Sequence, residues 1–216
     1  RLIELSLRSM KNIENKSHQP NETTVDRPAK QTLEDPAHGL GNNNFTIDSI
    51  PLKPLSDDTP VAAVDVSSIK IGETETGILC AVRGAIVWKE KNRYKYFRIG
   101  PFPFHTTEEN RKEIYNLLRH YYFEIPEDTN APNLINMQTK IGNLFERWLQ
   151  LGISSSAYGT IILWDGSLTA GTFDSPVNVI SQLLEIARNR LNTVLAFSKT
   201  TNLRLLGHRL TDLAEK

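Results

Sequence analysis

The stretch IILWDGSL at residues 161–168 decides the fold of this chain and its candidate function. Its four apolar residues predict a buried strand, and Asp165 stands where that strand ends. A second stretch, VAAVDVSS at residues 61–68, places Asp65 in the same way. Because an aspartate is disfavoured in strands and is costly to bury unpaired, two such strand ends indicate a cation between the carboxylates. We therefore expect divalent-metal chemistry on phosphate esters at this edge of the sheet.

The composition is that of a globular domain with a tail. The chain has 216 residues, 39% of them hydrophobic, and no apolar run reaches the roughly 18 residues that a membrane-spanning helix needs. The single cysteine, Cys80, excludes an internal disulfide, and we expect it to lie in the core. With no visible secretory signal, these features favour a cytoplasmic protein without a membrane partner.

Charge is balanced overall but unevenly distributed. The 25 basic and 25 acidic residues cancel, yet residues 81–100 hold six basic residues against one acid. A local basic surface steers a polyanion to one face, although solvated strand residues explain the same pattern equally well. The candidate DNA contacts are Arg83, Lys89, Lys91, Arg93, Lys95, Lys199 and Arg204.

The first 59 residues differ from the rest. Apolar spacing over residues 1–13 predicts a short amphipathic helix. Residues 14–59 are rich in Asn, Pro, Asp, Thr and Ser and predict a long linker or extended arm. The chain thus divides into an N-terminal helix and arm, 1–59, and a folded domain, 60–216.

The first half of the domain predicts three strands and a helix. Residues 61–66 favour a strand buried on both faces, and residues 78–88 and 94–99 favour two more, joined by a polar turn. Prolines in residues 100–104 should end the third strand, and Thr106 with Glu109 fits a helix capping box. Core packing, rather than base stacking, is expected for the aromatic residues Tyr94, Tyr96, Phe97, Phe102 and Phe104.

The second half alternates helices and strands. We expect a helix over 134–149, a strand over 160–164, a helix capped by Ser175 with Pro176 in its first position, a strand over 193–197 and a last helix from residue 203. The helix that begins after Ser175 should bury Ile180, Leu183, Leu184, Ala187 and Leu191. This order is typical of an α/β, ribonuclease-H-like mixed sheet: a three-strand antiparallel meander plus parallel strands, flanked by helices. In that architecture the first strand pairs with the fourth.

Three short motifs resemble the NurA family of DNA-repair nucleases. They are VDVSS at residues 64–68, LWDGSL at 163–168 and FSKT at 197–200, and the resemblance covers roughly residues 60–205. The family usually shows Asp-Gly-Ser at the first motif, where this chain has Val66 in place of the glycine.

The resemblance implies a manganese-dependent nuclease, with magnesium as the alternative ion, acting on DNA ends in double-strand break repair. It also implies a homodimer that works with a HerA-like hexameric ATPase, the translocase of this system. Family members carry further metal-site residues toward the C-terminus of a longer chain. This sequence stops at Lys216, so we expect either a truncated chain or an incomplete site.

Four residues form the expected catalytic site. Asp65 and Asp165 would bind metal, and Glu146, on the helix before the Asp165 strand, would be the third acid. A solvated glutamate beside Arg147 explains Glu146 equally well. Lys199 would hold a phosphate as a point charge, or is an ordinary exposed lysine.

Two other functions remain open. One is a NurA-like module that has lost catalysis and only binds DNA or the translocase, which Val66 and the short C-terminus favour. The other is an actin-like or sugar-kinase-like ATPase fragment. That class needs glycine-rich phosphate loops, and residues 67–72 supply only a poor version.

Overall fold

A computed structural model describes most of the folded domain. It describes residues 1–11, 13, 51, 53–54, 58–124, 131–166, 168, 170–171 and 176–197, and the backbone of residues 204–205 and 208–209. The expected arm at 14–59 therefore lies almost wholly outside the described residues.

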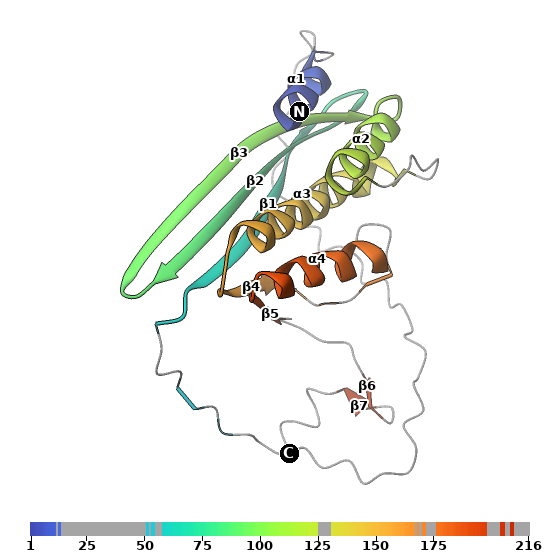
Figure 1. Cartoon of the computed structure of the whole chain (residues 1–216). Coiled ribbons are helices and arrows are strands. Elements are labelled where there is room, and N and C mark those ends of the chain that lie inside the picture. The colour runs from blue at the N-terminus through green and yellow to red at the C-terminus, as the bar shows by residue number, and fades with distance from the viewer. Residues whose placement is uncertain are drawn as a thin grey trace.

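The domain is built on a five-stranded mixed sheet (Figure 1). Its strand order is β3-β2-β1-β4-β5, and β1 pairs antiparallel with β2, β2 antiparallel with β3, β1 parallel with β4 and β4 parallel with β5. The expected meander, the parallel strands and the pairing of the first strand with the fourth are confirmed. The strands are β1 (Val61–Glu73), β2 (Gly77–Glu90), β3 (Arg93–Thr107), β4 (Ile161–Asp165) and β5 (Thr193–Phe197).

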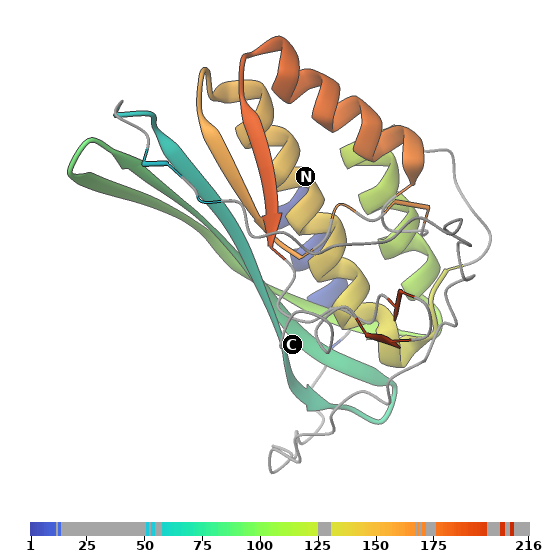
Figure 2. The ribbon, with the colours of Figure 1, turned by 90° about the horizontal axis from the view of Figure 1, so that it is seen from below.

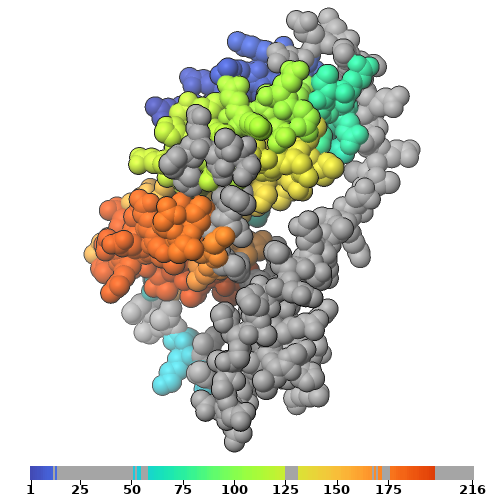
Figure 3. Space-filling view, turned by 90° about the vertical axis from the view of Figure 1, so that its right-hand side faces the viewer, coloured from blue at the N-terminus to red at the C-terminus, as the bar shows by residue number. Residues whose placement is uncertain are grey.

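The four described helices form a layer against one face of this sheet (Figures 1 and 2). Figure 3 looks onto that layer, with the first, second and fourth helices stacked one below another. The core between the layers contains Val64, Phe104, Phe145, Ile162 and Trp164. The helices are α1 (Leu2–Met10), α2 (Arg111–Phe123), α3 (Leu134–Ser156) and α4 (Val177–Asn189).

Strand β1 is buried on one face only, so the expectation of burial on both faces is wrong. Ala62 and Val64 are buried toward the helices, whereas Val61 and Ala63 are half-buried and Asp65 is exposed. Since successive side chains alternate across a strand, these three share the face that the described helices leave uncovered.

Strand β3 continues through its two prolines, contrary to expectation. It is an edge strand, where a proline's missing amide need not interrupt pairing. The Ser6 hydroxyl of α1 donates to the Pro103 carbonyl at 2.6 Å, and the Ser9 hydroxyl accepts from the His105 amide at 3.3 Å. Helix α1 therefore binds polar groups of the sheet edge that would otherwise be unpaired.

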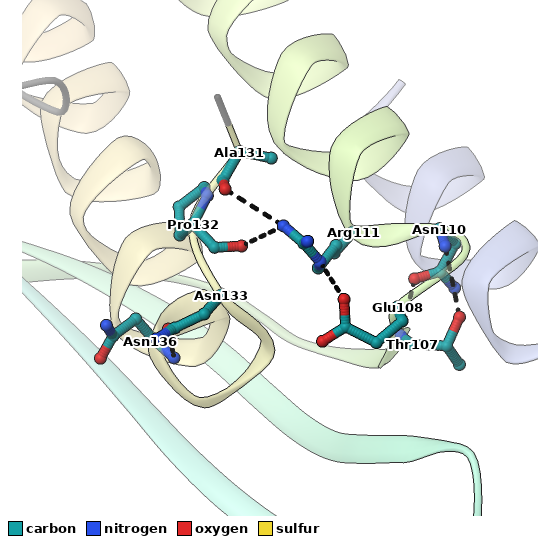
Figure 4. Close-up of polar contacts among 8 residues, drawn as sticks. All are labelled: Thr107, Glu108, Asn110, Arg111, Ala131, Pro132, Asn133 and Asn136. Atoms are coloured by element: carbon teal, nitrogen blue, oxygen red, sulfur yellow. Dashed lines mark hydrogen bonds and ion pairs between the residues drawn. The ribbon is translucent and has the colours of Figure 1, made fainter. Parts of the chain in front are cut away.

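The expected capping box of Thr106 with Glu109 is wrong, and the N-cap residue of α2, Asn110, makes no side-chain capping bond. Reciprocal bonds instead join Thr107 and Asn110 in the turn before the helix. The Thr107 amide donates to Asn110 Oδ1 at 2.8 Å, and the Asn110 amide donates to Thr107 Oγ1 at 3.2 Å (Figure 4). Thr106 instead ends buried in β3, because that strand extends to Thr107. Arg111, the first helical residue, donates to the carbonyls of Ala131 and Pro132 just before α3.

Three further expectations about the second half need correction. Pro176 caps α4 rather than occupying its first position, and Leu191 is 66% exposed in a left-handed turn after the helix. The expected last helix is wrong for the residues described there, which pair as β6 (Arg204–Leu205) and β7 (His208–Arg209). Ser175 lies outside the described residues.

Candidate active site

The two aspartates lie side by side. The parallel pairing of β1 and β4 runs from Val61 with Ile161 to Val64 with Trp164, and Asp65 and Asp165 are the next residues of each strand. Neighbouring strands lie about 4.8 Å apart, so the register brings the two acids together at the centre of the sheet. Both residues are exposed. The register thus places the two aspartates at corresponding positions of adjacent strands.

Gly166 turns the chain directly after Asp165. Its φ is +114°, a conformation that favours glycine, and its amide donates to the Phe197 carbonyl at 2.8 Å. Apart from its two chain neighbours, no heavy atom of the described residues lies within 4 Å of the place where a Cβ would stand. The described part of the chain therefore leaves open space on that side of Gly166.

Glu146, on α3, is near enough to both aspartates for their charges to affect its pKa. Burial raises the pKa of this carboxyl to about 7; Arg147 lowers it, and the negative charges of Asp165 and Asp65 raise it further. The side chain is half-buried, unlike a glutamate on an exposed helix face. Glu146 is thus electrostatically coupled to both aspartates and is partly protonated at neutral pH.

Gln150, which the sequence pattern did not single out, connects Glu146 with Arg147 on α3. Gln150, fully buried, donates to Glu146 Oε1 at 3.4 Å and accepts from the Arg147 guanidinium at 2.6 Å. The same guanidinium lies 5.6 Å from the centre of the Trp164 ring, the residue before Asp165. Gln150 lies four residues after Glu146 and three after Arg147 on the same helix, and this spacing was the available signal.

The acids suit a hard divalent cation by their chemistry. Carboxylate oxygens are the ligands that Mn²⁺ and Mg²⁺ prefer, and Asp65 and Asp165 supply them from adjacent strands. Within the part of the chain that the structure describes, no three His, Cys, Asp or Glu side chains are grouped closely enough to hold a metal ion. The described site therefore consists of an aspartate pair with Glu146 nearby.

Only some of the expected DNA-contact side chains belong to the described part of the chain. Lys199 lies outside the described residues, and only the backbone of Arg204 is described, in β6. Arg83, Lys89, Lys91, Arg93 and Lys95 are all exposed on the β2–β3 hairpin.

Because successive side chains of a strand point to opposite faces of the sheet, these hairpin residues divide between the two faces. Lys89 pairs with Val61 and Arg83 with Ser67, on the face of the aspartates. Arg93 and Lys95 belong to the other face, where Lys95 lies 3.6 Å from Glu90.

The aromatic residues of β3 divide between core and surface. Phe104 is fully buried, and Phe102 packs against the core. Tyr94 and Tyr96 are each 71% exposed and Phe97 is 55% exposed, so the expected core packing is wrong for these three. Cys80 is buried as expected, and burial raises the pKa of its thiol to about 12.

Compared with known proteins, the chain matches no family model and no curated protein. None of the helices in the described ranges is long and apolar enough to cross a membrane. Function is therefore inferred from the site itself.

Proposed function

We propose that this chain is a metal-dependent DNA nuclease domain of the NurA type with a ribonuclease-H-like fold. The observation that carries the proposal is the placement of Asp65 beside Asp165 on the central parallel strands. The strand order, a meander continued by parallel strands, supports the fold assignment. Phosphodiester hydrolysis in DNA end processing is the activity that fits this site best.

The chain's own residues bind and orient the reactants. Asp65 and Asp165 would hold manganese, or magnesium, which would supply an activated water and stabilise the leaving 3′ oxygen. Glu146 is the proposed third ligand, although the described acids do not form a three-ligand group as they stand. In the metal-free chain the pKa of Glu146 lies near neutrality, so a bound cation would displace its proton. Open space at Gly166, the residue after Asp165, would let a phosphate approach the backbone there.

Partners follow from the resemblance and the surface charge. DNA would meet the exposed basic residues of the β2–β3 hairpin through its phosphates, so binding should be largely independent of sequence and sensitive to salt. A homodimer, a HerA-like hexameric translocase and a cytoplasmic location belong to the same proposal.

A cleavage assay tests the nuclease proposal. The full chain is incubated with linear DNA in manganese, in magnesium and in a chelator, with and without an added HerA-like translocase. We expect cleavage in manganese that the chelator abolishes and that Asp165→Asn lowers by at least about 100-fold. Glu73→Gln, at the opposite end of β1, is the matched control. Equal cleavage by wild type and Asp165→Asn would refute the assignment. ATP hydrolysis by the chain alone would instead favour the ATPase fragment.

A binding module without catalysis is the second candidate. The observation that favours it is that the described acids form no three-ligand group. Binding of DNA by wild type with no cleavage in either metal would support this candidate over the nuclease.

A further inference from the structure

Strand β3 carries a ladder of rings and a cation on the uncovered face of the sheet. Tyr94, Tyr96 and Arg98 occupy alternate positions and so share one face. Both rings are 71% exposed, and the Arg98 guanidinium lies 5.2 Å from the centre of the Tyr96 ring. Exposed neighbouring aromatic side chains of this size usually mark a binding surface.

The pairing register connects this ladder to the acids. Arg98 pairs with Ala85, and Ala85 pairs with Asp65, so Arg98 and Asp65 lie in one row across the sheet. With strands about 4.8 Å apart, this row places the backbone of Arg98 roughly 10 Å from that of Asp65. Tyr96 and Tyr94 lie in the next two rows, toward the tip of the hairpin.

Charge on this face is suited to a polyanion. Its described charged residues on β2 and β3 are Arg83, Lys89 and Arg98, and the only acid of these two strands, Glu90, belongs to the opposite face. The negative side chains begin at β1, with Asp65. The hairpin also extends past the helical layer, so its open face is accessible from the side (Figures 1 and 2).

We propose that Tyr94, Tyr96, Arg98 and Lys89 bind single-stranded nucleic acid and lead it to Asp65 and Asp165. Unpaired bases stack on the two rings, and the two cations contact the phosphates. The delivery of the strand to the two aspartates rests on the proposed nuclease function, whereas the binding surface itself does not. A duplex keeps its bases stacked on one another and gains nothing from the rings.

A second copy of this chain fits the surface less well. A twofold contact through this face would bring the basic ladder of one copy close to that of the other. Juxtaposed like charges oppose such an interface, whereas the same charges favour a phosphate backbone.

A binding titration in a chelator tests the proposal without cleavage. The probe is a fluorescently labelled oligodeoxythymidine of about 16 nucleotides, followed by anisotropy with the full chain. We expect Tyr94→Ala and Tyr96→Ala each to weaken binding by about 5- to 100-fold and Tyr→Phe at either position to restore it. Lys89→Ala and Arg98→Ala should each reduce the salt slope by about 1.

A matched control lies on the opposite face of the same strand. Phe97→Ala should change oligonucleotide affinity by less than about twofold, and circular dichroism should show every variant folded. A blunt duplex should bind more weakly than the single strand and should not respond to the tyrosine substitutions.

Two outcomes would overturn the proposal. One is wild-type oligonucleotide affinity in the Tyr94→Ala, Tyr96→Ala double variant. The other is that this variant loses self-association in sedimentation while keeping oligonucleotide affinity, which would assign the face to a second copy. Asp165→Asn should bind the oligonucleotide normally in the chelator. Tyrosine-dependent binding by a chain that never cleaves would therefore refute only the nuclease function.

Discussion

Asp65 and Asp165 occupy corresponding positions of two adjacent parallel strands, one residue beyond the pair formed by Val64 and Trp164. Like charges at such positions repel each other, and each lowers the stability of the fold slightly. A bound cation removes this repulsion, so the same placement that costs stability in the free chain favours metal binding.

We expect divalent metal to stabilise the chain through this pair. Manganese at about 100 times its dissociation constant should add about 2.7 kcal/mol to the free energy of unfolding. Asp65→Asn and Asp165→Asn should abolish that gain while raising the stability of the metal-free chain by about 0.2–1 kcal/mol, because the repulsion is gone. Thermal melts with and without manganese measure both effects. Wild-type stabilisation by manganese in either variant would contradict the assignment of the site.

Glu146 should make stability depend on pH. Its pKa is raised by burial from 4.5 to about 7 in the folded chain, so the folded chain binds more protons than the unfolded chain between these values. Stability contributed by the protonated group is therefore present at low pH and is lost as the pH rises from about 4.5 to 7.

Glu146→Gln lacks this titration, so its free energy of unfolding relative to wild type should rise by about 3 kcal/mol between pH 4 and pH 8. Denaturant titrations at a series of pH values measure the difference, with Glu73→Gln as the control for adding an amide at the surface. A constant difference between Glu146→Gln and wild type across this range would show that the carboxyl is not buried as described.

Two glycines should respond oppositely to alanine. At Gly84 a Cβ would lie 2.4 Å from Leu149 Cδ1 and 2.9 Å from Phe145 Cε1, so Gly84→Ala should destabilise the chain by about 1–3 kcal/mol. At Gly152, inside α3, a Cβ meets nothing within 4 Å, so Gly152→Ala should stabilise by about 0.5–1 kcal/mol. Chemical denaturation measures both, and effects of the same sign would contradict the packing of α3 on β2.

Helix α1 should protect the edge of the sheet. Ser6 and Ser9 are buried, and each hydroxyl binds a polar backbone group of β3. Replacing both with alanine should cost about 1–3 kcal/mol and promote self-association through the freed edge. Melting curves and size-exclusion chromatography at several concentrations test this. Replacing exposed Ile3 with alanine is the control. An unchanged melting temperature in the double serine variant would show that α1 does not protect the edge of β3.

Local pattern predicted the two strands that carry the acids. Asp165 ends β4 as expected, but the expectation that Asp65 ends its strand is wrong, because β1 continues to Glu73. The apolar runs before Asp165 and Asp65 are strands, and residues 193–197 form β5 as expected. These elements were predictable because buried strands show as short apolar runs whose ends are marked by polar residues. The three-strand meander followed from the short turns between its strands.

Other features depend on neighbours far away in the sequence. The prolines of β3 are tolerated because that strand lies at an edge and its outward carbonyl at Pro103 meets Ser6. Tyr94 and Tyr96 are exposed because strand register places them on the face of the sheet that the described helices leave uncovered, although their residue types suit a core equally well.

The sequence by itself determined where each aspartate stands, since the end of an apolar run is a local property of the chain. Only the tertiary structure decided that Asp65 and Asp165 are neighbours, that the buried carboxyl of Glu146 is coupled to them and that the rings of β3 face solvent in the adjoining rows. Those relationships arise from strand register and from which face the helices cover, and both are set by packing between segments up to 100 residues apart.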